Sequence, residues 1–404
     1  MKSKWRAYHL DEITELVIDY RGKTPKKLGG DWSESGYRAL SAKNIKTGHL
    51  VQPDTIRFVS EEMYHKWMKD EIQRGDIIIT SEAPFGQILY WDSEEKIVLS
   101  QRLFGVRVKK EYDSKFVYYY MTTSDFQGEM DGRATGTTVV GLRQSELMKC
   151  VVRCPNLDTQ KKIASILSSI DEKILINDKI NENLEQQARA VFQAWFIDYE
   201  PFGGAAPLAW HPSTLGQIAE LKTDSWSPAK NPDVMVEHYS IPAFDDQHYP
   251  VFEIAAGIKS NKYILNSNSV MISKLNPDTK RIWRPLCLSA HSVCSTEFIV
   301  YEAKKQEQRD YIYSILDSIP FLNHLCSHTT GSTNSRQRAT PKSTLDFTLC
   351  LPPDSIIEDF CQIVTPMYDL IASNIVENQS LAKTRDSLLP RLMSGELDVS
   401  TIEL

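Results

Sequence analysis

The feature that most constrains this chain is a stripe of apolar residues that repeats about every 3.5 residues from Ile163 to Trp195. A stripe with this period lies along one side of a long helix and needs a partner helix of the same period to cover it. The chain contains such a partner, because the pattern returns from Phe360 to Leu392. Each stripe also carries two asparagines at matching places. Polar residues on an apolar seam cost stability but fix the register of pairing.

An antiparallel arrangement sets these asparagines opposite each other, Asn177 against Asn378 and Asn181 against Asn374. The predicted helix-pairing seam comprises Asn177, Asn181, Leu184, Ile371, Asn374, Asn378 and Leu381. Arg385 is a charged residue at a seam position. We expect its aliphatic stem to lie along the seam while its guanidinium extends into solvent. At about 1.5 Å per residue, each helix would extend roughly 50 to 60 Å.

Three residues bear on where these helices begin. Asp158 and Asp354 are suitable N-caps at the start of each stripe. Pro366 lies early in the second stripe, and proline cannot donate the helical hydrogen bond. The sequence therefore predicts a kink or a later helix start near Pro366.

The helices belong to a larger internal duplication. Each half opens with a short amphipathic segment. This segment is followed by two apolar strands, a Thr-Gly loop with an arginine, and a strand that ends in proline. The matching strands are expected at 75–80 and 104–108 in the first half, and at 269–273 and 298–301 in the second. The interiors diverge, since residues 14–74 and 219–268 share almost nothing. A common scaffold that carries two different surfaces suits a protein that recognises two different targets.

The predicted fold is α/β (α+β), with two tandem α/β domains joined by two long antiparallel coiled-coil helices. The predicted boundaries are 1–157 for the first domain, 158–199 for its helix, 200–209 for a linker, 210–353 for the second domain, and 354–404 for the second helix and tail.

Composition excludes several classes. With 41% apolar and 25% charged residues among 404, the chain is typical of a folded globular protein. It has no run of 18 apolar residues and no apolar signal-peptide core, so we expect a cytoplasmic protein that does not enter membranes. The seven cysteines are scattered and never form a C-x-x-C pair, which indicates reduced thiols. A net charge of -7 requires any nucleic-acid surface to be local.

Catalytic motifs are absent from the sequence. It contains no phosphate-binding loop, dinucleotide fingerprint, nucleophile elbow or zinc-protease motif. It also lacks the tetrad expected of a methyltransferase that acts on base amino groups. Two weaker patterns remain, a nuclease-like set of Asp278, Glu302 and Lys304, and a metal-like set of His324, Cys326 and His328. An ordinary surface is the more economical explanation of both, and we predict no catalytic residue and no metal site.

Nucleic-acid binding fits the polar residues better, because basic and amide side chains gather at segments that vary or turn. Lysines and hydroxyls suit phosphates, whereas Arg, Asn and Gln can contact base edges. The alternative for any one of them is a solvated surface side chain. The candidates in the first domain are Arg21, Lys23, Lys26, Lys27, Lys43, Asn44, Lys46, Gln101, Arg102, Arg133, Thr135, Thr137, Thr138 and Arg143. Those in the second are Lys259, Ser260, Asn261, Lys262, Ser273, Lys274, Lys280, Arg281, Arg284, Thr330, Ser332, Thr333, Asn334, Arg336 and Arg338.

With these features in place, the chain resembles the DNA specificity (S) subunits of Type I restriction-modification systems over nearly its full length. The resemblance rests on the two helices, on Gln-Lys-Lys-Ile-Ala at 160–164, and on the Thr-Gly loop before each helix. It also rests on 42–48 and 75–78 in the first domain and on 239–245, 258–262 and 273–277 in the second.

The resemblance implies that each domain is a target recognition domain reading one part of a bipartite double-stranded DNA sequence, with the helices as a ruler. It also implies docking of two methyltransferase (M) subunits, which bind S-adenosylmethionine, while this chain binds no cofactor. Restriction (R) subunits would join the full complex. Two other hypotheses stay open, a metal-dependent nuclease using the Asp278 set and a DNA-binding regulator without partners.

Overall fold

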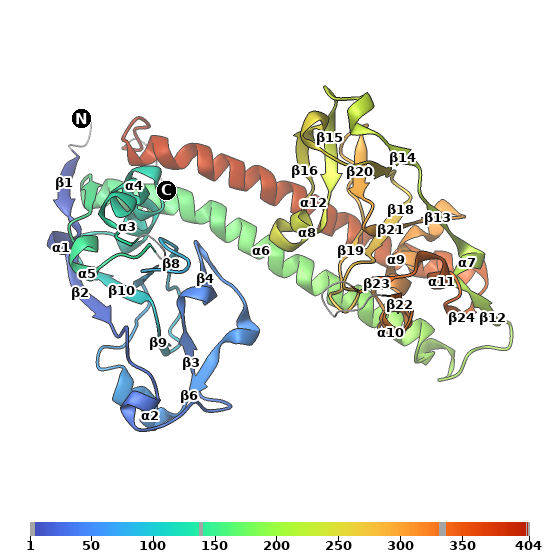
Figure 1. Ribbon diagram of the computed structural model, residues 1–404, viewed down its shortest axis with the longest axis horizontal. Coiled ribbons are helices and arrows are strands. Elements are labelled where there is room, and N and C mark those ends of the chain that lie inside the picture. Colours follow the sequence, from blue (N-terminus) through green and yellow to red (C-terminus); the bar gives the residue numbers. More distant parts are fainter. Residues whose placement is uncertain (1–4, 137–139, 331–336, 401, 403–404) are drawn as a thin grey trace. The chain divides into compact units, whose positions relative to one another are not determined.

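The computed structural model describes residues 5–136, 140–330, 337–400 and 402. The chain forms two compact units, Met1–Ile174 with Ser380–Leu404, and Leu175–Gln379. Each unit contains a globular α/β domain and a part of both long helices, α6 (Leu157–Phe196) and α12 (Asp354–Met393) (Figure 1). Among the described helices, none is long and apolar enough to cross a membrane. All seven cysteines are free thiols, as predicted.

The first unit is built on a four-stranded antiparallel sheet with the order β2-β10-β7-β8. These strands are β2 (Thr14–Asp19), β7 (Ile77–Thr80), β8 (Ile88–Tyr90) and β10 (Leu103–Val108). A three-stranded sheet contains β3 (Tyr37–Leu40), β6 (Arg57–Val59) and β9 (Ile97–Leu99). Two-stranded ladders join β1 (Arg6–His9) to β11 (Val151–Cys154) and β4 (Ile45–Lys46) to β5 (His49–Leu50). The short helices are α1 (Leu10–Ile13), α2 (Glu61–Trp67), α3 (Ser114–Met121), α4 (Ser124–Arg133) and α5 (Gln144–Leu147).

The second unit repeats the central sheet in the order β13-β21-β18-β19. Its strands are β13 (Ala219–Lys222), β18 (Ser269–Ser273), β19 (Ile282–Trp283) and β21 (Phe298–Ala303). A five-stranded sheet contains β14 (Ser225–Trp226), β15 (Met235–Tyr239), β16 (Val251–Ile254), β17 (Lys262–Ile264) and β20 (Ser292–Ser295). Ladders join β12 (His211–Thr214) to β24 (Thr348–Leu351) and β22 (Thr329–Thr330) to β23 (Arg338–Ala339). The short helices are α7 (Leu215–Ile218), α8 (Ile241–Gln247), α9 (Arg309–Asp317), α10 (Ile319–Ser327) and α11 (Pro341–Thr344).

The predicted duplication of the frame is therefore confirmed, because both central sheets share one strand order and both are followed by a strand that leads into a long helix. The divergent interiors correspond to the second sheets, which have three strands in one unit and five in the other.

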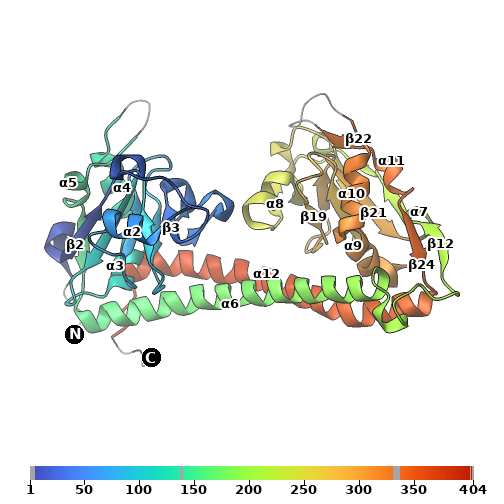
Figure 2. The same ribbon diagram turned by 90° about the horizontal axis from the view of Figure 1, so that it is seen from below.

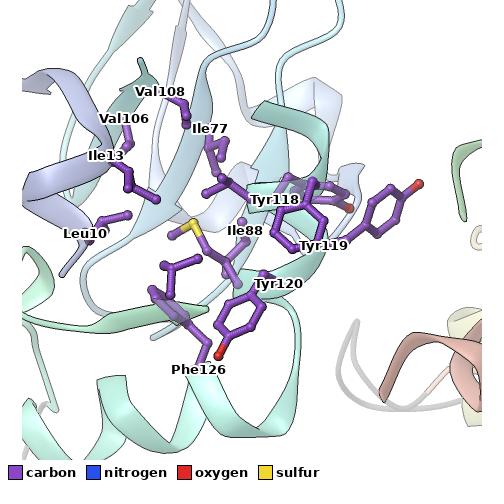
Figure 3. Close-up of a cluster of buried hydrophobic side chains, with 14 of the residues drawn as sticks. Leu10, Ile13, Ile77, Ile88, Val106, Val108, Tyr118, Tyr119, Tyr120 and Phe126 are labelled. Carbon is purple, nitrogen blue, oxygen red and sulfur yellow. The ribbon is translucent and has the colours of Figure 1, made fainter. Parts of the chain in front are cut away.

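Strand β7 shows why the core forms where it does. Ile77 and Ile79 belong to the cluster beneath α3 and α4, while Ile78 belongs to the cluster on the opposite face. Successive strand residues point to opposite faces, so a continuous apolar run fits a strand covered on both sides. Figure 3 shows the first cluster, with Tyr118, Tyr120 and other aromatic side chains from α3 and α4 gathered near the sheet residues.

In the second unit, the corresponding apolar cluster contains residues of the sheet, α9, α10 and both long helices. Figure 2 shows α9 and α10 beside this sheet. Phe192 and Phe196 of α6 meet Phe360 of α12, with ring centroids 6.0 Å and 5.0 Å apart. Large buried aromatic rings such as these dominate the apolar area removed from water.

The antiparallel seam has the predicted register. Asn177 Nδ2 donates to Asn378 Oδ1 at 2.8 Å, and Asn374 Nδ2 donates to Asn181 Oδ1 at 2.8 Å. Asn181 and Asn374 are both buried, so their bond satisfies amide groups that are largely shielded from water.

Arg385 behaves differently from our expectation. Its guanidinium donates to Asp171 of α6 at 2.8 Å, and Asp171 also accepts a hydrogen bond from Tyr119 at 2.6 Å. Burial alone would lower the pKa of Arg385, but Asp171 and the neighbouring Asp386 raise it. The arginine thus crosses the seam to an ion pair instead of pointing outward.

The helix starts correct two further predictions. Asn156 caps α6, since its Oδ1 accepts from the Thr159 amide at 2.8 Å, whereas Asp158 lies inside the first turn. Asp354 is the first residue of α12, and its carboxylate accepts instead from Gln308 at 2.6 Å. Nor does α12 start late at Pro366, because one helix runs from Asp354 to Met393.

The buried asparagine pair gives a testable prediction. Replacing Asn181 alone by Leu should lower the free energy of unfolding by about 1–3 kcal/mol, because the Asn374 amide is left buried without its partner. Replacing both by Leu should recover that loss, since an apolar pair suits the seam. Urea unfolding of the single and double variants measures this. A double variant no more stable than the single one would contradict a paired role.

Candidate nucleic-acid interface

In the first unit, four predicted segments meet at one edge because of the strand directions. β3 runs parallel to β9, with Leu40 beside Leu99, so the carboxyl ends of both strands lie at the same edge. The chain continues from β3 into the 3₁₀ helix η2 (Ala42–Asn44), which lies against the turn after β9, where Ala42 N donates to Gln101 O at 3.3 Å. Lys43, Gln101 and Arg102 are consequently neighbours at this edge.

The carboxyl end of β7 arrives at the same place. Ser81 follows β7, and its amide donates to Arg102 O at 2.8 Å. Leu142, which follows α4 in the chain, is held at this point, since its amide donates to Ser81 O at 3.0 Å. Arg21 completes the group, donating from its guanidinium to Leu142 O at 3.3 Å.

Several cations at this edge already have carboxylate partners. Arg102 pairs with Glu82 at 3.0 Å, and Arg133 pairs with Glu129 at 3.1 Å. Arg21 pairs with Asp19 and lies 4.0 Å from the Phe104 ring. Among the other predicted cations of this unit that the structure describes, Lys26, Lys27, Lys43 and Arg143 are exposed and no ion pair joins them to a carboxylate of the described residues, and Gln101 and Thr135 are also exposed. Lys46 is exposed as well.

The second unit repeats this junction with different side chains. Lys274 follows β18, and its amide donates to Glu297 O at 2.9 Å, just as Ser81 bonds to Arg102. Ala339 N donates to Lys274 O at 2.9 Å, so Ala339 is held at the strand end in the same way as Leu142 in the first unit. The charges are reversed, because Glu297 stands where the first unit has Arg102 and pairs with Arg338 of the loop at 3.0 Å. Hydrogen bonding to Glu297 raises the pKa of Arg338.

Other candidates of the second unit divide into exposed and engaged side chains. Lys259, Ser260, Asn261 and Thr330 are exposed, and Lys274 is half-buried. Arg281 pairs with Asp245 at 2.6 Å, and Lys280 pairs with Asp317 at 2.5 Å.

The structure gives several predicted contacts a structural role instead. Asn44 is fully buried, donates to Thr55 Oγ1 at 2.9 Å and accepts from Ser41 Oγ at 2.8 Å. Burial lowers the pKa of Lys262, whose ammonium donates to Ser260 O at 2.9 Å. Three further candidates donate hydrogen bonds to backbone carbonyls, namely Ser273 to Leu275 O, Lys23 to Trp67 O and Lys27 to Gly22 O. Arg284 forms ion pairs with Asp310 and Asp369. These side chains therefore support the fold, and we assign them no direct contact with DNA.

Six predicted candidates, namely Thr137, Thr138, Ser332, Thr333, Asn334 and Arg336, lie outside the described residues.

The nuclease-like set is not brought together. Glu302 pairs with Ser269 at one end of β18, whereas Asp278 follows the other end, about 13 Å or more along the chain direction. Glu302 accepts from Asn266 at 2.7 Å, and Lys304 donates to the Gly216 carbonyl at 2.7 Å. These side chains therefore hold the fold together.

The metal-like set also points elsewhere. His324 Nε2 lies 2.9 Å from Ser343 O, and His328 Nδ1 lies 2.9 Å from His324 O. Each of these ring nitrogens is therefore hydrogen-bonded to a backbone carbonyl. Within the described part of the chain, no group of three or more His, Cys, Asp or Glu side chains is placed to hold a metal ion.

Sequence reasoning missed the carboxylates Glu82 and Glu297, which neutralise an arginine in each junction. It also missed Trp32 and Arg57, whose guanidinium lies 5.0 Å from the Trp32 ring. No local pattern marks either pair, because each forms between segments that only the fold brings together.

Comparison with known proteins agrees with this architecture. A family model described as Type I restriction modification DNA specificity domain matches residues 2–186. The MjaIX specificity subunit of Methanocaldococcus jannaschii is 26% identical over 351 residues, which cover 81% of this chain and 79% of that protein. The HindI specificity subunit of Haemophilus influenzae is 23% identical over 417 residues, covering 81% and 88%.

A solved structure shares the fold. The S subunit of a Type I restriction-modification system from M. genitalium aligns over 97% of this chain and 96% of its own, with a TM-score of 0.62 and 16% sequence identity. Residues 2–186 therefore match the DNA specificity domain of Type I restriction-modification systems, and over most of its length the chain is similar to the specificity subunits of these systems.

Proposed function

We propose that this chain is a non-catalytic specificity subunit that reads a bipartite double-stranded DNA target, one part with each α/β domain. The observation that carries the proposal is the repeated junction at the strand ends. Both units hold a residue of a later segment at the end of a central strand, Leu142 at Ser81 and Ala339 at Lys274. Both also carry an arginine–carboxylate pair there, but the paired positions differ, because Arg102 pairs with Glu82 beside the strand end whereas Glu297 pairs with Arg338 of the later segment. Two equivalent sites with different chemistry suit the reading of two different sequences.

The long helices act in this proposal as the spacer between the two recognition events. Forty residues at about 1.5 Å each extend roughly 60 Å. Modules that contact one face of a duplex repeat at about 34 Å, one helical turn, which is within reach of helices of this length. The two asparagine pairs hold the helices in one register, so the proposed spacer has a fixed length.

The proposed partners rest on the similarity of this chain to Type I specificity subunits. We propose that two methyltransferase (M) subunits dock on this chain, bind S-adenosylmethionine and modify the DNA, and that restriction (R) subunits join the full complex. The assembly would act in the cytoplasm, where the DNA is.

Opposite changes in DNA affinity test the proposed interface. Arg102→Ala should weaken binding and reduce the slope of log affinity against log salt by about 1, because one phosphate contact is lost. Glu82→Gln should strengthen binding, because it frees Arg102 from its 3.0 Å ion pair. The pair is about half-exposed, so neither change should cost much stability. Fluorescence anisotropy of a labelled duplex with the chain and its co-purified methyltransferase measures both.

The matched control is Glu95→Gln. Glu95 pairs with Arg38 in the same unit, but it precedes β9 and so lies away from the carboxyl ends that form the junction. This variant should bind as the unchanged protein does. Equal effects of Glu82→Gln and Glu95→Gln would argue against a DNA interface at the junction, and the absence of a methyltransferase in the purified material would favour a partner-free regulator.

A further inference from the structure

A pocket of about 410 Å³ opens in the first unit beside the strand-end junction. Its size lies within the range of about 300–1,000 Å³ that is typical of ligand sites. Lys43, Gln101 and Arg102 line it, and so do Trp32 and Arg57, which come from segments outside the predicted DNA contacts. The pocket therefore adjoins the edge to which the proposed function assigns DNA.

The charge of the lining favours an anion. Lys43, Arg57 and Arg102 supply three cations, and no carboxylate is among the lining residues. Only Arg102 has an acidic partner, Glu82, among the ion pairs of the described residues. Cations gathered in a concave site concentrate the field on whatever anion enters.

Two hydroxyl groups that line the pocket are held in place by a buried asparagine. Ser41 and Thr55 line it from opposite segments, and buried Asn44 bonds to both, at 2.8 Å and 2.9 Å. The hydroxyls are thus held by a side chain that no solvent reaches. Preorganised hydroxyls cost little entropy when they bind a ligand.

Trp32 supplies a surface of another kind. Its half-buried ring lies beneath the Arg57 guanidinium, at 5.0 Å, and is supported by Trp67 at 6.2 Å. Bases outside a double helix stack on aromatic rings and on guanidinium planes. A stacking surface next to an anion site matches the two parts of one nucleotide, the base and the phosphate.

We propose that this pocket holds one unstacked nucleotide of the bound DNA, with its base against Trp32 and Arg57 and its phosphate against Lys43 and Arg102. The inference rests on the proposed function, because that function brings DNA to this edge. It goes further in assigning a nucleotide out of the stack to the first unit. The second unit has Glu297 at the position of Arg102, so the same anion site is not repeated there.

The test compares two labelled duplexes of the same sequence, one fully paired and one with a single bulged thymidine, which costs little to unstack. The unchanged chain should bind the bulged duplex more tightly, by about 5- to 150-fold, the range that base stacking on an aromatic ring contributes. Trp32→Ala should abolish this ratio, and Trp32→Phe should retain part of it. Arg57→Gln changes an exposed residue and should also lower the ratio. This variant replaces Trp32→Ala as the test if Trp32→Ala does not fold.

The loss of a positive charge weakens binding to both duplexes alike, so it does not change the ratio of the two affinities. Lys26→Ala, which removes an exposed lysine outside the pocket, is the control and should leave this ratio unchanged. A ratio of one in the unchanged chain, or a ratio that survives both Trp32→Ala and Arg57→Gln, would overturn the inference while paired-duplex binding still supports the proposed function. If deoxythymidine monophosphate displaces neither duplex but binds the pocket tightly, a free nucleotide is the ligand and the DNA assignment is wrong. Failure to bind either duplex would contradict the proposed function itself.

Discussion

Replacing Asp310 by Ala is expected to lower the free energy of unfolding of the second unit by about 3–5 kcal/mol, because it removes the buried carboxylate on which the largely buried Arg284 and Arg309 guanidiniums converge. Asp310 is only 3% exposed and accepts from Arg284 at 2.8 Å, from Arg309 at 3.1 Å and from Thr365 of α12 at 2.7 Å. This carboxylate thus connects the strand region, α9 and α12 within the unit. Urea unfolding measures the loss.

Asp369 offers a matched control, because it pairs with the same Arg284 at 2.7 Å but its side chain is 63% exposed. Asp369→Ala should cost about 1 kcal/mol or less, as exposed ion pairs do. Similar losses for the two variants would contradict the role assigned to burial.

The same carboxylate predicts a dependence on pH. Burial alone would raise the pKa of Asp310, but Arg284, Arg309 and Thr365 lower it below the usual 3.8. A carboxyl whose folded pKa is depressed stabilises the fold above its unfolded pKa, and that contribution disappears as pH falls through the folded value. The stability difference between the unchanged chain and Asp310→Ala should therefore be constant near neutral pH and shrink below about pH 4.

Lengthening both long helices should change the DNA spacer and nothing else. We propose to insert four residues between Asn177 and Asn181 and four between Asn374 and Asn378, so that the new segments face each other in the seam. Four residues add about 6 Å of helix, and B-DNA rises about 3.4 Å per base pair. The recognised spacer should grow by about one to two base pairs, while both half-sites stay the same.

Insertion into α6 alone is the control, because it shifts one asparagine pair out of register and should destabilise the seam. Sequencing of methylated bases in cells that carry each variant identifies the motif. Altered half-sites with an unchanged spacer would contradict the role of the helices as a ruler.

The parts of the fold that were predictable are those with a local signal. The seam register follows from spacing within each stripe, and the asparagine bonds confirm it. Strands β7 and β18 were predictable because apolar runs between turn residues indicate strands covered on both faces. Helix ends were less certain, and Asn156, two residues before Asp158, proved to be the cap.

The candidate site was only partly predictable because exposure depends on distant partners. Asn44 looks like a surface amide until the fold brings Thr55 and the Gln52 carbonyl to it. Lys43, its neighbour, stays exposed. The sequence therefore located the segments that meet at the strand ends, but it could not separate side chains that support this edge from side chains that stay exposed there.

The most direct test of the central claim is long-read sequencing of modified bases in host DNA, with this chain present or deleted and the neighbouring methyltransferase intact. The account predicts a two-part methylated motif with a fixed gap that disappears when the chain is deleted and returns when it is restored. Methylation by an expressed methyltransferase that stays the same after deletion would contradict the account.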